Sequence, residues 1–189
     1  MSVYSVKDDG RFRLCSVIFG CSLFLAIGIN YYLNLVWTLT PDLILIQGAI
    51  TISPTLICFL IIRHVPRSLF LLFHIPDING EYSGILVSSF NECKQVPVKL
   101  IIKQQIFNIS IVLKTESSDS INNTAYIEIN DDGSISLTYT YQNKGCYMGT
   151  RLNSHTGTCN ATIMSQKITA RYYSDPDRKT YGILDLTKD

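Results

Sequence analysis

Charged side chains are scarce in this chain of 189 residues, of which 16% are charged and 47% are hydrophobic. Two stretches, Leu14 to Pro41 and Leu43 to Ile62, contain no Asp, Glu, Lys or Arg at all. From residue 65 onward, basic and acidic side chains occur in equal number. This balance argues against the extended basic surface that binds polymeric nucleic acid. The composition fits one domain with an additional membrane portion.

Signatures of catalysis and of metal binding are also missing. The chain contains no G-x-S-x-G, no H-E-x-x-H, no P-loop and no dinucleotide-binding glycine fingerprint. Its cysteines and histidines show neither a C-x-x-C pair nor the Cys/His spacing of a zinc site. We therefore predict a protein that is not an enzyme and that binds no metal and no cofactor. An enzyme that uses His155, the one histidine of the carboxy-terminal half, is kept as an alternative.

The two uncharged stretches predict transmembrane helices. Each is long enough for the roughly 20 helical residues that cross a hydrocarbon core, and no small-residue cleavage site of a signal peptide follows the first. Lys7 and Arg11 precede the first stretch and Arg63 follows the second, so the positive-inside rule predicts that both termini are cytoplasmic. The predicted segments are a cytoplasmic N-terminus at 1–13, transmembrane helices at 14–36 and 43–62, a juxtamembrane connector at 65–76 and a cytoplasmic β-rich domain at 77–189.

From Gly80 onward, hydrophobic residues recur at every second position, which is typical of half-buried strands. Val96 to Lys103 and Phe107 to Lys114 alternate in this way, and the segment NDDG at 130–133 predicts a hairpin turn of the Asp-Gly type. We expect eight strands joined mostly by short turns. Such strands close into an antiparallel up-and-down, lipocalin-like barrel, whose interior is filled or holds one small ligand. An open sandwich is the alternative.

A Gly-x-aromatic sequence, Gly80 to Tyr82, opens this region and resembles the entry strand of lipocalin-like barrels, where the aromatic ring closes the barrel floor. The rings of inward-facing tyrosines can stack on nucleobases, and their hydroxyl groups can donate hydrogen bonds. The same rings can instead fill a barrel core, and both roles remain open. Alternation places four tyrosines on the inward face: Tyr82, Tyr139, Tyr141 and Tyr172.

The last 35 residues contain the pattern His155-x-Gly157-Thr158, then an aromatic hairpin, then Arg178-Lys179-Thr180-x-Gly182-x-Leu184. Together with the segment PDINGEYSG and the two amino-terminal spans, this layout resembles the two-transmembrane β-rich effectors that are associated with CD-NTases in bacterial CBASS anti-phage defence. The resemblance covers nearly the whole chain. The order and spacing of these short motifs carry the resemblance.

The resemblance implies a mechanism. In that family the cytoplasmic β-barrel senses a cyclic oligonucleotide, such as a cyclic dinucleotide, which a partner CD-NTase synthase makes during infection. Binding drives self-assembly, and the clustered helices disrupt the lipid of the inner membrane and stop growth before phage matures. The four tyrosines then become candidate ligand contacts, with Arg151 and Arg178 as candidate phosphate donors, because guanidinium groups bind phosphate bidentately. Arg171 falls on the outward register of its strand, which argues against a contact inside the barrel.

Small residues in the two predicted spans recur at four-residue spacing, a pattern that allows close approach of helices. Asn34 and Gln47 lie about equally far from the connecting turn near Thr40, so their side chains can hydrogen-bond across the helices. Packing within one hairpin and packing between copies of the chain both remain open. The small-residue pairs are Ser16 and Gly20, Ser22 and Ala26, and Ala49 and Ser53.

A membrane-anchored carrier of a small apolar ligand is the main alternative, because a lipocalin-like pattern alone equally permits it. Such a carrier needs an apolar cavity, and a tyrosine-rich interior argues against one. The sequence therefore predicts a membrane-anchored all-β protein, and it favours a nucleotide sensor over a lipid carrier.

Overall fold

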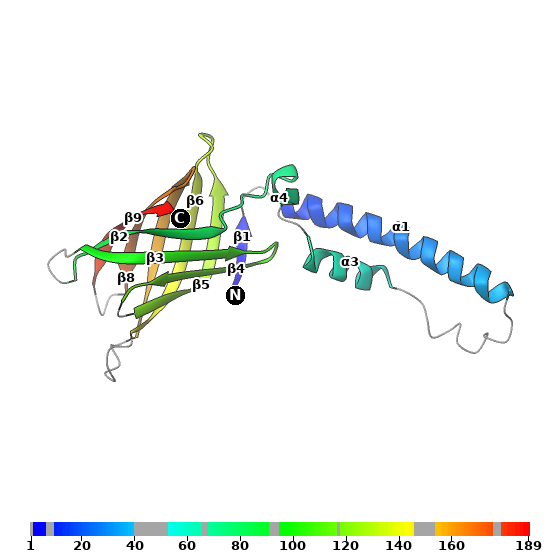
Figure 1. The fold of residues 1–189 in the computed structure, drawn as a ribbon, viewed down its shortest axis with the longest axis horizontal. Helices are drawn as coiled ribbons and strands as arrows, with labels where there is room; N and C mark the ends of the chain where they lie inside the picture. The colour runs from blue at the N-terminus through cyan, green and yellow to red at the C-terminus, as the bar shows by residue number, and fades with distance from the viewer. Residues whose placement is uncertain are drawn as a thin grey trace. The chain divides into compact units, whose positions relative to one another are not determined.

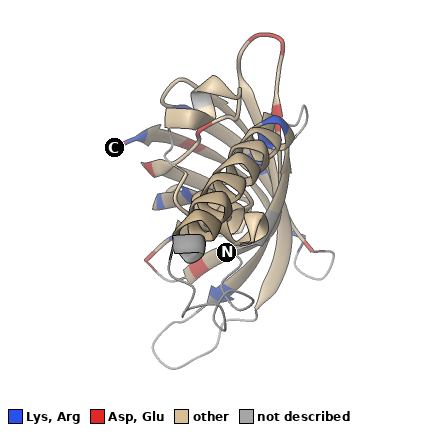
Figure 2. Cartoon of the chain, turned by 90° about the vertical axis from the view of Figure 1, so that its right-hand side faces the viewer, with Lys and Arg blue, Asp and Glu red and all other residues tan. Residues whose placement is uncertain are grey.

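A computed structural model describes residues 2–6, 10–39, 53–65, 68–90, 95–116, 118–145, 154–175 and 179–189. The chain forms two compact units (Figure 1). One unit combines Met1–Asp8 with Pro76–Asp189 and contains the β-sheet, and the other, Asp9–Ile75, is helical. Charged residues are concentrated in the first unit, while the helices are almost free of them (Figure 2).

The helical unit begins with α1, Gly10–Leu39, followed by α3, Pro54–Arg63, and α4, Ser68–Leu72. Within α1, the segment Gly10–Val36 is long and apolar enough to cross a membrane, which agrees with the first predicted span. The first half of the second predicted span, 43–52, lies outside the described residues, and the second half consists of Ser53 and most of the ten residues of α3. A second membrane crossing therefore stays a prediction.

One face of α1 carries a buried stripe with four-residue spacing. Leu14, Ile18, Ser22 and Ala26 are each at most 6% exposed, and α3 packs against α1. The Ser22 hydroxyl donates to the Ile18 carbonyl at 2.6 Å, which satisfies this polar group inside an apolar contact. Ser22 and Ala26 are thus small residues on the buried face of α1, and their predicted role in close helix packing stays a prediction.

The other small and polar residues predicted to pack between helices lie elsewhere. Ser16 and Asn34 are exposed on α1, and no described atom lies within 4 Å of a Cβ placed on Gly20. Ser53 precedes α3, where its hydroxyl group bonds to that of Thr55. Gln47 and Ala49 lie outside the described residues. Contacts of this second set with another copy of the chain stay a prediction.

The sheet is a closed antiparallel barrel, in which β2 pairs with β9 and each strand from β2 to β9 otherwise pairs with its neighbour in sequence. The predicted eight-stranded up-and-down barrel is confirmed. Alternate residues point inward, so large side chains such as Ile127, Leu137 and Ile168 are at most 1% exposed. The strands are β2 Gly80–Ser88, β3 Gln95–Gln104, β4 Asn108–Lys114, β5 Ser118–Ile129, β6 Ile135–Gly145, β7 His155–Met164, β8 Lys167–Ser174 and β9 Tyr181–Lys188.

A further short strand, β1, Ser2–Val6, joins the barrel from the start of the chain. It pairs antiparallel with β4 through Ser2 and Val3, and parallel with β5 from Tyr4 to Val6. Direct pairing of β4 with β5 covers only Val112 to Lys114. β1 therefore fills the space where β4 and β5 diverge. The sequence pattern placed residues 1–13 in a cytoplasmic segment outside the barrel, and a strand there was not predicted.

Buried polar groups close the barrel end at which β2 begins. The side chain of Gln104, 3% exposed, accepts from the Ile78 N–H at 3.1 Å and donates from Nε2 to the Tyr4 hydroxyl and the Pro76 carbonyl, both at 2.9 Å. Tyr82, 2% exposed, donates its hydroxyl to the Ile78 carbonyl at 3.2 Å. All these polar groups have hydrogen-bond partners. We call this closed end of the barrel, which their side chains fill, the floor. Tyr82 lies where the Gly-x-aromatic entry predicted it.

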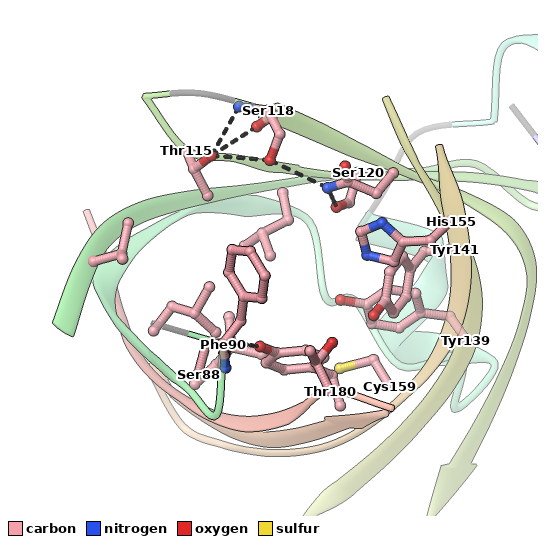
Figure 3. A pocket seen from close by; sticks show the side chains of 16 residues that line it. Ser88, Phe90, Thr115, Ser118, Ser120, Tyr139, Tyr141, His155, Cys159 and Thr180 are labelled. Carbon is pink, nitrogen blue, oxygen red and sulfur yellow. Dashed lines mark hydrogen bonds between the residues drawn. The ribbon is translucent and has the colours of Figure 1, made fainter. Parts of the chain in front are cut away.

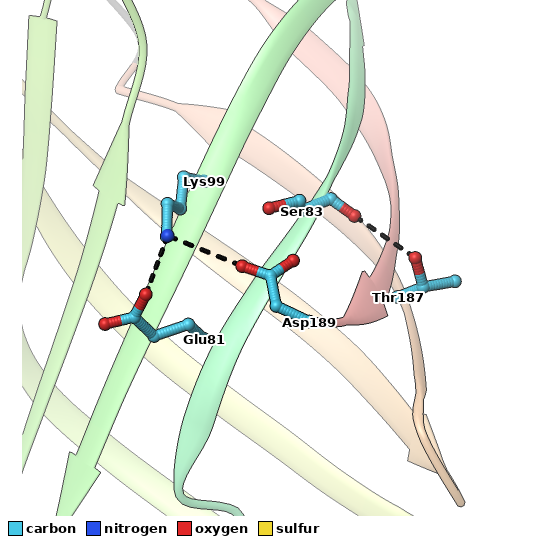
Figure 4. A network of polar contacts seen from close by, with 5 residues as sticks. All are labelled: Glu81, Ser83, Lys99, Thr187 and Asp189. Carbon is cyan, nitrogen blue, oxygen red and sulfur yellow. Dashed lines mark hydrogen bonds and ion pairs between the residues drawn. The ribbon is translucent and has the colours of Figure 1, made fainter.

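Outside the barrel, an ion network ties the end of the chain to β2 and β3 (Figure 4). Lys99 Nζ lies 2.6 Å from Glu81 Oε2 and 3.4 Å from Asp189 Oδ2. The hydrogen bond to Glu81 raises the pKa of Lys99, and Asp189 adds to this effect. Because these side chains are largely exposed, the network contributes little stability and serves mainly to hold the last residue against the sheet.

Candidate functional site

The barrel contains a cavity of about 200 Å³ at the end opposite Tyr82. Every strand from β2 to β9 contributes at least one lining residue, from Leu86 and Ser88 on β2 to Leu184 on β9. Strands β2, β4, β6 and β8 end there, and β3, β5, β7 and β9 begin there. The polar floor at the other end makes this the open end of the barrel. A ligand in this cavity is therefore held by the whole barrel rather than by one loop.

Three of the four predicted tyrosines line this cavity. Tyr141 lies at the centre of an aromatic group, because its ring centroid is 6.4 Å from that of Tyr139, 6.5 Å from Tyr172 and 6.3 Å from His155. Tyr139, Tyr141 and His155 form one wall, and Phe90 faces them across the cavity (Figure 3). Tyr82, the fourth, is not among the lining residues. The alternation of residues predicted its inward direction correctly, but it lies in the floor.

Two glycines make room for two of these rings. A Cβ on Gly157 would lie 2.4 Å from the Tyr141 hydroxyl oxygen, and a Cβ on Gly182 would lie 2.4 Å from Tyr172 Cε1. In both cases the tyrosine and the glycine are direct cross-strand partners. Tyr141 on β6 pairs with Gly157 on β7, and Tyr172 on β8 pairs with Gly182 on β9. An aromatic ring that lies over a cross-strand glycine covers backbone that would otherwise be open. The glycines of the carboxy-terminal pattern therefore shape the aromatic wall.

A polar cluster on β5 and β6 completes the lining, and sequence reasoning missed it. Asn143 Nδ2 donates to Ser118 Oγ at 3.2 Å and to Ser120 Oγ at 2.8 Å, and Ser118 also bonds to Thr115. The signal was present, because Asn143 follows Tyr141 by two residues and so shares its inward face. Across the cavity, the Tyr172 hydroxyl donates to Ser88 Oγ at 2.5 Å.

Acidic and basic side chains are absent from the described lining, apart from the imidazole of His155. Arg151 and Arg178, the predicted phosphate donors, lie outside the described residues, so their role stays a prediction. Arg171 is exposed on β8, on the outward register that the alternation predicted. The cavity itself thus offers aromatic faces and neutral hydrogen-bonding groups.

Burial keeps two weakly acidic groups of the cavity, the Cys159 thiol and the Tyr139 hydroxyl, protonated. It raises the pKa of the Cys159 thiol to about 11 and raises the pKa of Tyr139 well above its usual value. Neither group is therefore ionised near neutral pH, and Cys159 lacks the thiolate that a nucleophile needs. Among the described residues, no group of His, Cys, Asp and Glu is arranged to hold a metal ion. This arrangement suits binding of a flat, polar ligand.

Comparison with known proteins adds one finding. A family model described as "Cap15, cyclic dinucleotide receptor domain" matches residues 73–188 of the chain. The matched range covers more than half of the chain and includes all strands from β2 to β9 and every residue that lines the cavity. No curated protein matches the chain.

Proposed function

Because the chain belongs to the family of the Cap15 cyclic dinucleotide receptor domain, a family of CBASS effectors, we propose that its barrel binds a cyclic dinucleotide at the open end. The observation that carries this proposal is the tyrosine-lined cavity within the matched range. Aromatic rings provide stacking faces for nucleobases, whatever the base. The neutral hydroxyl and amide groups beside them provide hydrogen-bond partners for base edges.

In this proposal, Tyr139, Tyr141 and Tyr172 contact the ligand inside the barrel, and Arg151 and Arg178 contact its phosphates from the connections at the open end. Guanidinium groups are suited to this task because their N–H groups match two phosphate oxygens at once. Tyr82, which lies in the floor, supports the barrel from below and makes no direct ligand contact.

The effector function extends this proposal to the helices. Ligand binding drives self-assembly of the chain in the inner membrane, with both termini in the cytoplasm, and the clustered helices disrupt the bilayer and arrest growth. A CD-NTase synthase supplies the ligand. The apolar surface of α1 supports contact with lipid or with other copies, since side chains such as Phe24, 77% exposed, project from it.

Calorimetry of the full chain in lipid nanodiscs tests the binding step. Tyr141→Ala and Arg178→Ala should each weaken binding of a cyclic dinucleotide by roughly ten- to a hundredfold, because each removes a stacking face or a charge-assisted hydrogen bond. Arg171→Ala is the matched control, since this arginine is exposed on the outer face of β8. Its affinity should equal that of the wild type.

Two results would contradict the proposal. Failure of every cyclic dinucleotide tested to bind the wild-type chain would exclude the sensor function. Tight binding of a fatty acid or another apolar ligand in the same cavity would favour the carrier, which the apolar part of the lining, including Leu86 and Leu113, permits. Melting temperatures measured in parallel separate a lost contact from a lost fold.

A further inference from the structure

We propose that the cavity admits a single nucleobase of the ligand, leaves the phosphates outside, and selects a base that carries an exocyclic amine through the side chain of Asn143. This inference rests on the function proposed above and concerns which part of the ligand enters the barrel. Three observations carry it: the size of the cavity, the charge of its lining and the hydrogen bonds of Asn143.

Size limits what can enter. The cavity has a volume of about 200 Å³, while pockets that enclose a drug-sized molecule measure roughly 300 to 1,000 Å³. A cyclic dinucleotide has two bases, two riboses and two phosphates, and is at least as large as such a molecule. Only a part of it fits, and the flat base is the part that matches an aromatic wall.

The charge of the lining indicates which part of the ligand enters the cavity. The described lining residues include no Lys or Arg, so a phosphate placed among them would lose its water without gaining a cation from them. A nucleobase is neutral and gains stacking in the same place. The rings of Tyr141 and Tyr172 are inclined by 69° to each other. A base that stacks on one ring therefore presents an edge to the other.

Asn143 is held in a defined orientation by two serines. Its Nδ2 donates to Ser118 Oγ and Ser120 Oγ, so its amino group is already engaged and its Oδ1 is the atom that can accept from a ligand. An acceptor pairs with the exocyclic amine of adenine, cytosine or guanine. Uracil has no exocyclic amine. The cluster therefore favours an amino-bearing base, and Ser118 and Ser120 act as positioning residues for it.

The test compares cyclic di-AMP with cyclic di-UMP on the full chain in nanodiscs, by calorimetry. The wild type should bind cyclic di-AMP about tenfold more tightly, the usual effect of one hydrogen bond of this kind. Asn143→Leu should reduce this preference to less than threefold. Asn143→Asp, which keeps an acceptor that the serine hydroxyl groups can hold, should retain it. Adenosine, which has a base and no phosphate, should compete with cyclic di-AMP.

The outcomes separate this inference from the function on which it rests. If neither cyclic dinucleotide binds the wild type, the proposed function fails and this inference fails with it. If both bind and Asn143→Leu weakens them equally, the asparagine has only a structural role and the inference alone is wrong. It is also wrong if inorganic pyrophosphate competes with cyclic di-AMP and adenosine does not, because the phosphates would then occupy the barrel.

Discussion

Some residues shape the cavity because they have no side chain. Gly182 is an example, because a Cβ there would lie 2.3 Å from the Val87 carbonyl oxygen and 2.4 Å from the Tyr172 ring. Gly182→Ala should therefore lower the free energy of unfolding by about 1 to 3 kcal/mol, the usual cost of overpacking, and should also weaken ligand binding. Thermal denaturation and calorimetry measure the two effects.

The matched control for Gly182→Ala is Thr169→Ala, on the exposed face of the neighbouring strand β8. It should change the free energy of unfolding by no more than about 0.5 kcal/mol. If the two variants are equally stable, the close approach of Gly182 to Tyr172 is not what holds the ring in place.

Cys159 gives the barrel a predictable response to alkaline pH. Burial raises its pKa from 9.0 to about 11, so the folded state keeps a proton that the unfolded chain releases near pH 9. The free energy of unfolding should be unaffected by this thiol below pH 9 and should fall between pH 9 and 11, by at most about 3 kcal/mol. Tyr139, whose pKa is also raised by burial, adds to the fall above pH 10.

Urea denaturation at pH 8, 9, 10 and 11 measures this effect in the wild type and in Cys159→Ala. The variant should show a smaller loss of stability between pH 9 and 10, where the thiol dominates and phenols still hold their protons. The same slope in both proteins would show that another group controls the alkaline response.

Strands with a clear alternation of hydrophobic residues were predictable from the sequence. A strand that depends on pairing with segments far away in the sequence was not. The eight long strands follow from alternation, because each buries one face in the barrel. β1 has only five residues, and nothing local in Ser2–Val6 indicates that β4 and β5 diverge to receive it. The polar start of β5, Ser118 to Thr124, also escaped notice, since its inward residues are polar: Ser118 and Ser120 line the cavity, and Asn122 is buried and accepts from the Ile111 N–H.

The sequence predicted whether the side chains of the candidate site point into the barrel, but not where along the barrel axis each one lies. A period of two says which face of a strand Tyr82 and Tyr141 occupy, but not how far along the barrel each lies. One belongs to the floor and the other to the cavity. Asn143 was missed for a related reason: a polar inward residue is meaningful only when its partners, here Ser118 and Ser120, are known.

At the level of the helices, a substitution at Gly20 tests whether assembly is separate from ligand sensing. Among the described residues, no atom outside the backbone of α1 lies within 4 Å of a Cβ placed on Gly20, and we predict that another copy of the helix packs on this face. Gly20→Leu should obstruct close approach between copies and require roughly tenfold more protein for growth arrest, while ligand affinity stays unchanged. Gly20→Ala, which keeps a small residue, is the control. A loss of ligand affinity in Gly20→Leu would contradict this division between helices and barrel.

The whole molecule joins its β unit from two segments that the helical unit separates in sequence, Met1–Asp8 and Pro76–Asp189. The fragment 76–189 retains all eight long strands and the cavity, so it should be soluble, β-rich and cooperative in unfolding. It lacks β1, however, which leaves the β4 and β5 edges without a partner strand and removes the Tyr4 hydroxyl from Gln104 Nε2. A synthetic peptide of residues 1–9 should therefore bind the fragment.

Such binding should raise the melting temperature of the fragment in proportion to the logarithm of the peptide concentration, because the peptide binds the folded state alone. A gain of 1 kcal/mol corresponds to about 4 °C for a domain of this size. The peptide with Tyr4→Ala is the control and should have little effect, since Tyr4 is 3% exposed and its hydroxyl donates to the Gln105 carbonyl at 3.0 Å. A helical circular dichroism spectrum of the fragment would argue against an independent barrel. An unchanged melting temperature with both peptides would mean that β1 adds nothing to the barrel, and that β4 and β5 close the gap between them without it.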